Sequence, residues 1–343
     1  METISFMNIV YIFDEQFSTP AYISILSLLI NNTELDEINF FIFDDGINDS
    51  SRKDLFELVK KYNRNIKFIT PIRIIQMLKK MDVIPWRGRY SVYVKFFLQD
   101  YLPKEINRVI FLDADTIIDG SLRELNEMSL NGHPCAMALE GVHNRYKKYA
   151  GIGDNELYNT GVIVFDMDAW RRNRIEEKFL KHLMEICCHY MFPEEDPISV
   201  VLCKNVQRLS PDYNYITMFY YYATEKYFQR YQWNDAGNKF YSLEELVLSQ
   251  KSVKIYHCTD TFTNRPWEKN NIHPYTIKFD YYYEQSKLSD NEKKVYKAGI
   301  IRKVEFFLRK HLPAFASNYL YYVASKIYYT AKAKRHYKLL REK

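Results

Sequence analysis

The sequence predicts an α/β fold in which a mainly parallel central sheet is flanked by helices. Short apolar segments that resemble strands alternate along the chain with longer segments that resemble helices. The strand-like segments are almost continuously apolar, which is typical of strands buried on both faces. With 343 residues, 47% hydrophobic and 27% charged, the chain is long enough for an enzyme core and too apolar for extended disorder. We expect an α/β domain over 1–285 and a basic, Tyr-rich helical tail over 286–343.

The first part of the chain is expected to form three strands separated by helices. Thr19 offers an N-cap, and Pro20 suits the first turn of a helix that stops at Asn31 and Asn32. The strands are predicted at 8–13, 39–46 and 66–69, with a second helix at 55–62.

The same alternation continues to about residue 257. A helix is expected after Ser91, and a second begins near Asp168. The strands are predicted at 108–113, 134–140, 161–166 and 253–257, with 108–113 at the centre of the sheet. No strand is expected beyond residue 285.

Charge and cysteine usage limit the cellular setting. Residues 300–343 carry seven Lys and four Arg against two Glu, a local charge of +9 in a chain of net charge +5. The rest of the chain is therefore mildly acidic, and we expect no nucleic-acid partner. Five cysteines without a CxxC pattern favour a reducing cytoplasm. The sequence has no signal-peptide pattern and no run of 18 apolar residues.

The tail mixes basic residues with aromatic and aliphatic ones. This composition fits an interfacial helix whose rings enter the headgroup region while Lys and Arg reach anionic lipid. The alternative is that the rings pack on the catalytic domain and the charges form a solvated face. The first interpretation predicts a cytoplasmic protein held peripherally on the inner face of the membrane.

Polar residues gather where strands end, and ligands bind at strand carboxyl ends in open α/β sheets. These residues are Asp14, Asp113, Asp115, Asn159 and His257.

The segment FLDADTIIDG (111–120) places Asp113 and Asp115 one residue apart after a buried strand. Both carboxylates can reach one hard cation, Mg²⁺ or Mn²⁺, which phosphate oxygens can bridge. The alternative is a turn cap and a solvated carboxylate. FDMDAW (165–170) has the same spacing, and there we expect the structural role, with Asp168 as the N-cap of a helix.

Three further segments carry candidate site residues. His257 is followed by a loop containing Arg265; the imidazole could complete a carboxylate metal site and the guanidinium could bind phosphate, but either could be purely structural. Asn159 and Thr160 are expected just before a strand, with Gly161 permitting close backbone approach. Glu194, Glu195 and Asp196 precede an apolar segment, where such carboxylates are often only helix N-terminal charge.

Taken in order, these motifs resemble the glycosyltransferase family 8 enzymes, bacterial retaining transferases of lipopolysaccharide and related surface glycans. The similarity covers roughly residues 8–267. The matching segments are NIVYIFDEQF, YVKFFLQDYLP, RVIFLDADTIIDG, YNTGVIVFDMDAWR, EEDPIS and HCTDTFTNRPW. The resemblance implies a GT-A fold and transfer of galactose or glucose from a UDP-sugar to a glycan or glycolipid acceptor.

The resemblance also implies a role for each matching position. Asp113, Asp115 and His257 would hold Mn²⁺, or Mg²⁺, against the diphosphate. Glu194, Glu195 and Asp196 would lie near the anomeric carbon as the catalytic groups. The donor site would be formed by Ile12, Asp14, Gln16, Lys95, Ala114, Asn159, Gly161 and Arg265.

Three positions depart from the family pattern. Lys95 stands where an arginine is usual, Glu195 where a glutamine is usual, and Arg265 where a lysine is usual. The first change keeps the charge beside the diphosphate but loses the bidentate fork.

Two other interpretations fit parts of the sequence. The DxD pattern also describes a haloacid-dehalogenase phosphatase with Asp113 as nucleophile and Asp115 as acid, although that motif normally opens its domain. The substitutions at Lys95 and Glu195 would also suit a non-catalytic scaffold that binds a nucleotide-sugar.

Overall fold

The protein is described here from a computed structural model. It describes residues 6–86, 88–140, 147, 152–153, 155–185, 192–224, 240–260, 263–291, 293–295, 299–313 and, within the tail, 315–317, 319–321, 323–324, 327–328, 331 and 334–335.

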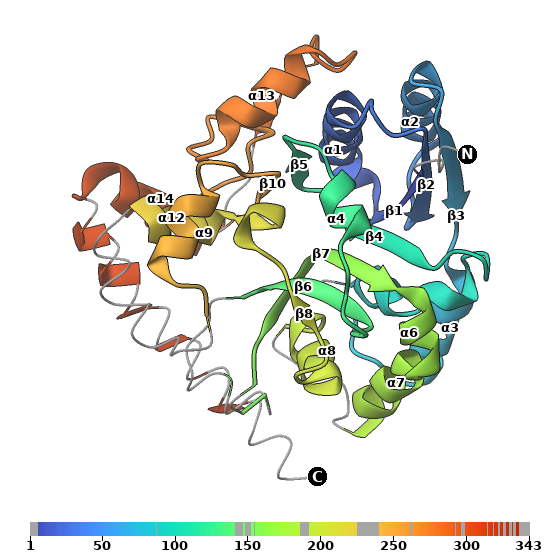
Figure 1. The fold of residues 1–343 in the computed structure, drawn as a ribbon. Helices are drawn as coiled ribbons and strands as arrows, with labels where there is room; N and C mark the ends of the chain where they lie inside the picture. Colours follow the sequence, from blue (N-terminus) through green and yellow to red (C-terminus); the bar gives the residue numbers. More distant parts are fainter. Residues whose placement is uncertain are drawn as a thin grey trace.

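A seven-stranded sheet forms the centre of the molecule (Figure 1), in the order β3-β2-β1-β4-β7-β6-β8. The strands β3, β2, β1 and β4 run parallel, β7 runs antiparallel to both β4 and β6, and β8 is parallel to β6. The predicted α/β fold with a mainly parallel sheet is confirmed. The strands are β1 (Phe6–Phe13), β2 (Glu37–Asp44), β3 (Asn65–Ile69), β4 (Arg108–Leu112), β6 (Cys135–Leu139), β7 (Tyr158–Asp166) and β8 (Gln207–Arg208).

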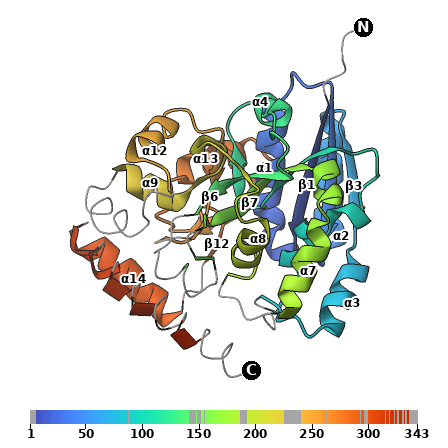
Figure 2. The same ribbon diagram turned by 60° about the horizontal axis from the view of Figure 1, so that its bottom comes forward.

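Helices cover both faces of this sheet (Figures 1 and 2). Helix α1 is buried along most of its length because it packs against β5, α2 and α13 as well as β1. The α-helices are α1 (Ser18–Asn31), α2 (Asp49–Lys61), α3 (Ile72–Lys80), α4 (Arg123–Glu127), α6 (Met167–Arg172), α7 (Ile175–Glu185), α8 (Glu195–Leu202), α9 (Thr217–Thr224), α12 (Leu243–Ser249), α13 (Thr276–Glu284) and α14 (Ile300–His311).

Two small sheets lie outside the central one. The first has the order β5-β10-β9, from β5 (Thr116–Ile118), β10 (Ile255–His257) and β9 (Tyr215–Ile216). The second pairs β11 (Glu268–Lys269) with β12 (Lys294–Val295), so a short strand does occur beyond residue 285, contrary to expectation. The last predicted strand, 253–257, is observed as β10, and it belongs to the first of these small sheets and not to the central sheet.

The helix starts differ from the sequence predictions. Thr19 is not an N-cap: the 3-10 turn η1 (Glu15–Phe17) runs directly into α1, whose N-cap is Phe17. Asp166, not Asp168, caps α6, because its Oδ1 accepts the Ala169 N–H at 2.8 Å. The end of α1 at Asn31 is as predicted.

The segment after Ser91 forms 3-10 helices, η2 (Ser91–Phe96) and η3 (Leu98–Asp100), and not the predicted α-helix. Its aromatic and β-branched side chains lose rotamer freedom in an α-helix. Most of them are buried, which favours a short, tight connection between α3 and β4. A further 3-10 turn, η4 (Pro211–Tyr213), precedes β9.

One buried carboxyl group belongs to a helix and not to the end of a strand. Glu176, at the start of α7, is 5% exposed and its Oε1 accepts the Gln99 N–H at 3.1 Å. Burial raises the pKa of Glu176 from 4.5 to about 8. The unfolded chain therefore releases this proton at lower pH than the folded chain does. Stability is lost as the pH rises from about 4.5 to 8.

The described part of the tail lies along one side of the molecule (Figure 2). The guanidinium of Arg309, in α14, lies 4.4 Å from the ring centroid of Tyr221 in α9. Large apolar side chains of the tail are exposed, namely Val304, Phe307, Phe315, Tyr319, Leu320, Ile327 and Tyr328. No helix among the described residues has both the length and the apolar character to cross a bilayer.

Candidate active site

The strand order reverses at β1, and this reversal positions the site. The chain adds β2 and β3 on one side of β1, and then crosses to add β4 on the other side. Side chains that follow β1 and β4 therefore face a common crevice, the usual ligand position in open sheets. Asp14 follows β1 and Asp113 follows β4.

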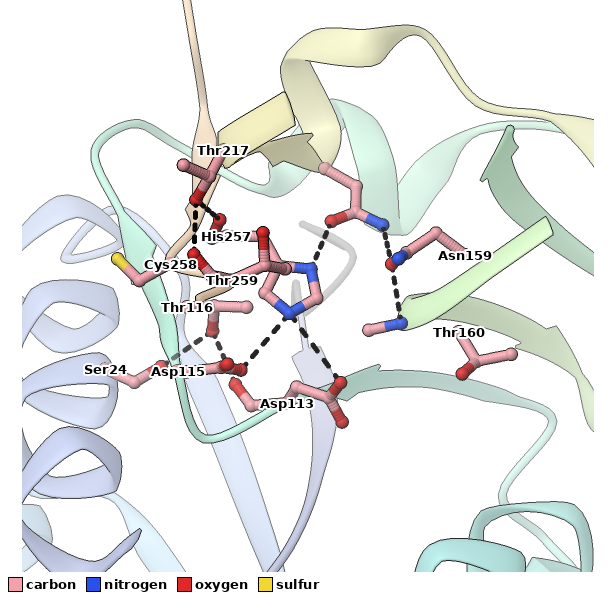
Figure 3. A network of polar contacts seen from close by, with 12 residues as sticks. Ser24, Asp113, Asp115, Thr116, Asn159, Thr160, Thr217, His257, Cys258 and Thr259 are labelled. Carbon is pink, nitrogen blue, oxygen red and sulfur yellow. Dashed lines mark hydrogen bonds and ion pairs between the residues drawn. The ribbon is translucent and has the colours of Figure 1, made fainter. Parts of the chain in front are cut away.

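Buried hydroxyls hold the turn that carries Asp113 and Asp115. Thr116 Oγ1 donates to the Asp113 carbonyl at 2.8 Å and bonds Ser24 Oγ at 2.9 Å (Figure 3). Ser24 Oγ itself bonds Tyr11 OH at 2.8 Å. Because Ser24 belongs to α1 and Tyr11 to β1, the turn is attached to the core on both sides. Its two carboxylates are thereby fixed in direction.

His257 reaches these carboxylates through the first side sheet. Strand β10 pairs with β5, which sets His257 opposite Thr116. Its Nε2 lies 3.2 Å from Asp115 Oδ1 and 3.8 Å from Asp113 Oδ2 (Figure 3). One ligand atom from each of the three residues falls within 4.8 Å of the others. The structure therefore brings together the three predicted metal ligands.

Gly161 makes room for the imidazole. A Cβ at this position would lie 2.1 Å from His257 Cε1, 2.6 Å from Nδ1 and 3.0 Å from Asp113 Oδ2. No side chain fits there without displacing the histidine. The close approach expected at Gly161 is therefore observed, and the group that lies against its backbone is the His257 side chain.

The placement of Asn159 and Thr160 differs from the prediction. Both lie inside β7, which begins at Tyr158, and not before a strand. Because β7 is antiparallel to β4, its first residues lie at the edge where β4 ends. Asn159 therefore reaches the site from the amino end of a strand, whereas a carboxyl end was expected.

Lys95 connects the predicted metal ligands to the acidic segment. Its Nζ lies 3.3 Å from Asp113 Oδ1, donates to the Thr160 carbonyl at 3.3 Å and forms an ion pair with Glu194. The side chain is 3% exposed, with its ammonium 4.5 Å from the Phe111 ring centroid. Burial would lower the pKa of Lys95, but Asp113 and Glu194 outweigh it and raise the pKa.

The acidic segment lies at the amino end of α8. Glu194 is the N-cap residue, and Glu195 and Asp196 occupy the first turn, as helix N-terminal charge would. The contact of Glu194 with Lys95 nevertheless ties the segment to the site. Burial, followed by the charges of Glu194 and Glu140, raises the pKa of Glu195 well above its ordinary value.

Arg265 lies on the other side of the candidate metal cluster. Its Nη1 forms an ion pair with Asp115 and donates to the Cys258 carbonyl. Burial would raise the pKa of Asp115, yet His257 and Arg265 lower it. Partial burial and the neighbouring Asp115 and Glu194 raise the pKa of Asp113, against the effect of Lys95. The two aspartates are therefore electrostatically unequal.

The residues predicted to contact the nucleotide lie around the end of β1. Asp14 accepts the Gln16 N–H at 2.9 Å and forms an ion pair with Arg89 at 2.9 Å. Ile12, in β1, is half-buried, and Ala114 is buried between the two aspartates.

Two structural partners were missed from the sequence. Arg89 pairs with Asp14 and Asp45, and Asn214 bonds His257 and Asn159. Neither residue stands in a recognisable motif, so only the folded arrangement identifies them.

Comparison with known proteins identifies the family to which the chain belongs. The sequence model of "Glycosyl transferase family 8" matches residues 8–236. The chain belongs to this family. The predicted resemblance, and the prediction of an enzyme of the glycosyltransferase class, are confirmed, and they displace the phosphatase interpretation of the DxD motif.

Similar proteins extend over most of the chain. It is 25% identical to the lipopolysaccharide 1,2-glucosyltransferase of Escherichia coli (strain K12), across 91% of this chain and 87% of that protein. It is 21% identical to general stress protein A of Bacillus subtilis (strain 168), across 82% and 94%. The structure of galactosyltransferase LgtC with donor and acceptor sugar analogues superposes with a TM-score of 0.65 at 16% identity, covering 87% of this chain and 100% of LgtC. The last likeness supports the GT-A fold.

Proposed function

We propose that this family 8 enzyme is a metal-dependent retaining hexosyltransferase. It moves galactose or glucose from a UDP-sugar to a surface-glycan acceptor such as lipopolysaccharide or capsule. The observation that carries the proposal is the convergence of Asp113, Asp115 and His257 at the point where the strand order reverses. The similarity to a lipopolysaccharide glucosyltransferase supports the acceptor class.

The donor set of this cluster fits Mn²⁺ or Mg²⁺. Two carboxylates and one imidazole suit these cations, and Gly161 leaves the space that the histidine needs. A bound cation would supply positive charge against the diphosphate leaving group. Asp113, Asp115 and His257 would hold it.

The chain itself supplies two further positive charges beside this cluster. Lys95 lies against Asp113, and Arg265 lies against Asp115. Diphosphate oxygens carry growing negative charge as the sugar–phosphate bond breaks, so both cations are placed to bind the leaving group. Arg265 can bind it bidentately, whereas Lys95 acts as a point charge.

The sugar side of the site is assigned to α8 and β7. Glu194, Glu195 and Asp196 supply negative charge near the anomeric carbon, where positive charge develops, or one of them supplies a nucleophile. Asn159 and Gly161 line the donor sugar pocket. Ile12, Asp14, Gln16 and Ala114 lie around the end of β1 and bind the uridine.

We assign the tail to an anionic membrane surface. Basic charge combined with exposed Phe307, Phe315 and Ile327 supports this assignment. The enzyme would then act in the cytoplasm, peripherally bound to the inner face of the membrane. The catalytic domain over 1–285 would remain folded without the tail.

Release of UDP tests the enzymatic proposal. The purified chain should release UDP slowly from UDP-glucose or UDP-galactose when Mn²⁺ is present, and EDTA should stop the release. Asp168→Ala is the control for Asp115→Ala, since Asp168 lies on the outer face of α6 with its side chain 55% exposed. Thermal shift against a panel of UDP-sugars with Mn²⁺ identifies the donor. Binding of UDP-sugar without any release would instead favour the scaffold interpretation.

Vesicle sedimentation tests the tail. The full chain should pellet with anionic but not neutral vesicles, and salt should release it because charge attraction is screened. Truncation after residue 299 should leave an enzyme that still releases UDP. If the truncated chain unfolds and the full chain ignores anionic vesicles, the tail belongs to the core and the membrane assignment is wrong.

A further inference from the structure

A chain of buried hydrogen bonds runs away from the candidate metal cluster. Asn214 Oδ1 lies 2.9 Å from His257 Nδ1, and Asn214 Nδ2 donates to Asn159 Oδ1 at 2.8 Å. Asn159 Nδ2 then donates to Glu140 Oε2 at 2.8 Å. In Figure 3, His257 lies between the two aspartates on one side and Asn159 on the other.

The direction of every bond in this chain is fixed by groups that cannot reverse. The Gly161 backbone N–H is a donor and lies 3.0 Å from the Asn159 amide, so the atom that faces it must be oxygen. The Glu140 carboxylate accepts, so the other end of the Asn159 amide must be the NH₂ group. The contacts at the two ends of the Asn159 amide thus give the same orientation independently.

The orientation of Asn214 follows from that of Asn159. The Asn159 oxygen requires the NH₂ group of Asn214 to face it, which leaves the Asn214 oxygen toward His257. An oxygen at 2.9 Å requires a proton on His257 Nδ1. The unprotonated nitrogen of the neutral ring is then Nε2, the atom that faces Asp115 and Asp113 at 3.2 and 3.8 Å.

We propose that Asn214 is a positioning residue that holds His257 in the tautomer with its proton on Nδ1, so that Nε2 is available to a metal ion. The inference rests on the metal role proposed above for His257.

The backbone around Asn214 is suited to this role. Asn214 is fully buried and lies between η4 and β9. Its N–H donates to the Pro211 carbonyl at 3.1 Å, and its carbonyl accepts the Ile216 N–H at 3.0 Å. Strand β9 pairs with β10 and sets Ile216 beside His257. The amide is therefore held by the same side sheet that carries the histidine.

The tautomer can be measured directly in the metal-free protein. Long-range ¹H–¹⁵N spectra of protein labelled with ¹⁵N-histidine distinguish the two ring nitrogens, and His257→Gln identifies the signal among the eight histidines. At a pH where the ring is neutral, we expect the proton on Nδ1. Asn214→Leu should lose this preference, whereas Asn214→Asp should keep it because an oxygen still faces Nδ1, although the bond that the Asn214 NH₂ group donates to Asn159 is lost.

Mn²⁺ binding without nucleotide, followed by the EPR signal of free Mn²⁺, gives the second readout. Asn214→Leu should weaken the affinity by about 10- to 100-fold, and Asn214→Asp should recover much of it. Asn32→Leu is the matched control. Asn32 is also fully buried, and it bonds the Leu28 carbonyl at 2.9 Å and the Leu122 N–H at 2.7 Å, away from the metal cluster. It should lose stability without changing the tautomer or the Mn²⁺ affinity.

Two results would overturn the inference. One is a wild-type His257 protonated on Nε2 when neutral, and the other is an Asn214→Leu variant with unchanged tautomer and affinity. A wild-type protein that binds no Mn²⁺ would refute the proposed metal site, while the tautomer measurement would still decide the role of Asn214. If Asn214→Leu does not fold, the wild-type spectrum and Asn214→Asp decide it.

Discussion

Adding one methyl group at Gly161 should disable the proposed metal site without replacing any of its ligand residues. In Gly161→Ala the new Cβ would lie 2.1 Å from His257 Cε1. Ordinary contact begins near 3.4 Å, so the imidazole must retreat by roughly 1.3 Å. The ring has little freedom to do so, because Asn214 Oδ1 holds Nδ1 at 2.9 Å and Asp115 Oδ1 lies only 3.2 Å from Nε2.

The consequence should appear in both binding and catalysis. A displacement of about 1 Å in an active site can cost about 100-fold in rate. We expect kcat/KM to fall by about that factor or more, and Mn²⁺ affinity to fall with it. The overpacked site should also cost about 1–3 kcal/mol of stability. UDP release, EPR titration with Mn²⁺ and thermal unfolding measure the three effects.

Gly120→Ala is the matched control. Its added Cβ would lie 2.7 Å from Lys254 Cδ, a nominal clash of similar kind, but the obstacle is the flexible end of a side chain that can swing away. Gly120→Ala should therefore retain Mn²⁺ affinity and rate. If Gly161→Ala binds Mn²⁺ and releases UDP as the wild type does, the argument that this glycine makes room for the ligand is refuted.

Variants at four other positions separate site residues from structural ones. Asp115→Ala should abolish Mn²⁺-dependent donor binding in thermal shift assays, whereas Asp166→Ala should cost only the α6 cap, about 0.5–2 kcal/mol by denaturant unfolding. Retained Mn²⁺-dependent binding in Asp115→Ala would remove it from the ligand set. Glu195→Gln should change kcat with donor affinity roughly preserved; an inert Glu195→Ala would place the chemistry elsewhere. The wild type should lose stability by about 1.4 kcal/mol per pH unit between about pH 4.5 and 8, and Glu176→Gln should not. The variant should therefore have a higher melting temperature than the wild type at pH 8. Equal pH profiles of the two proteins would contradict the raised pKa of Glu176.

The sequence predicts six of the seven strands of the central sheet, because burial gives most of them continuous apolar runs, and it misses the two-residue strand β8. It predicts the aspartates only together with the other motifs, because Asp166 and Asp168 have the same spacing at the end of a buried strand and play a structural role. Strand direction is less accessible: nothing in residues 158–166 distinguishes an antiparallel strand from a parallel one, so Asn159 was expected at the wrong end. Whether Asp166 or Asp168 caps α6 depends on the local backbone geometry, which the sequence does not show. Asn214 carries no pattern, because its partners are distant in sequence.

The late position of His257 has a consequence for biosynthesis. It follows Asp113 by 144 positions, so a nascent chain that has completed β5 possesses only the two carboxylates. The third proposed ligand, His257, reaches the carboxylates only after β10 has paired with β5. Incomplete or C-terminally truncated chains should therefore lack the full ligand set. A cation bound by the complete chain would link the side sheet that carries His257 to the strand β4 that precedes the two aspartates. Metal binding would therefore indicate that the whole domain has folded.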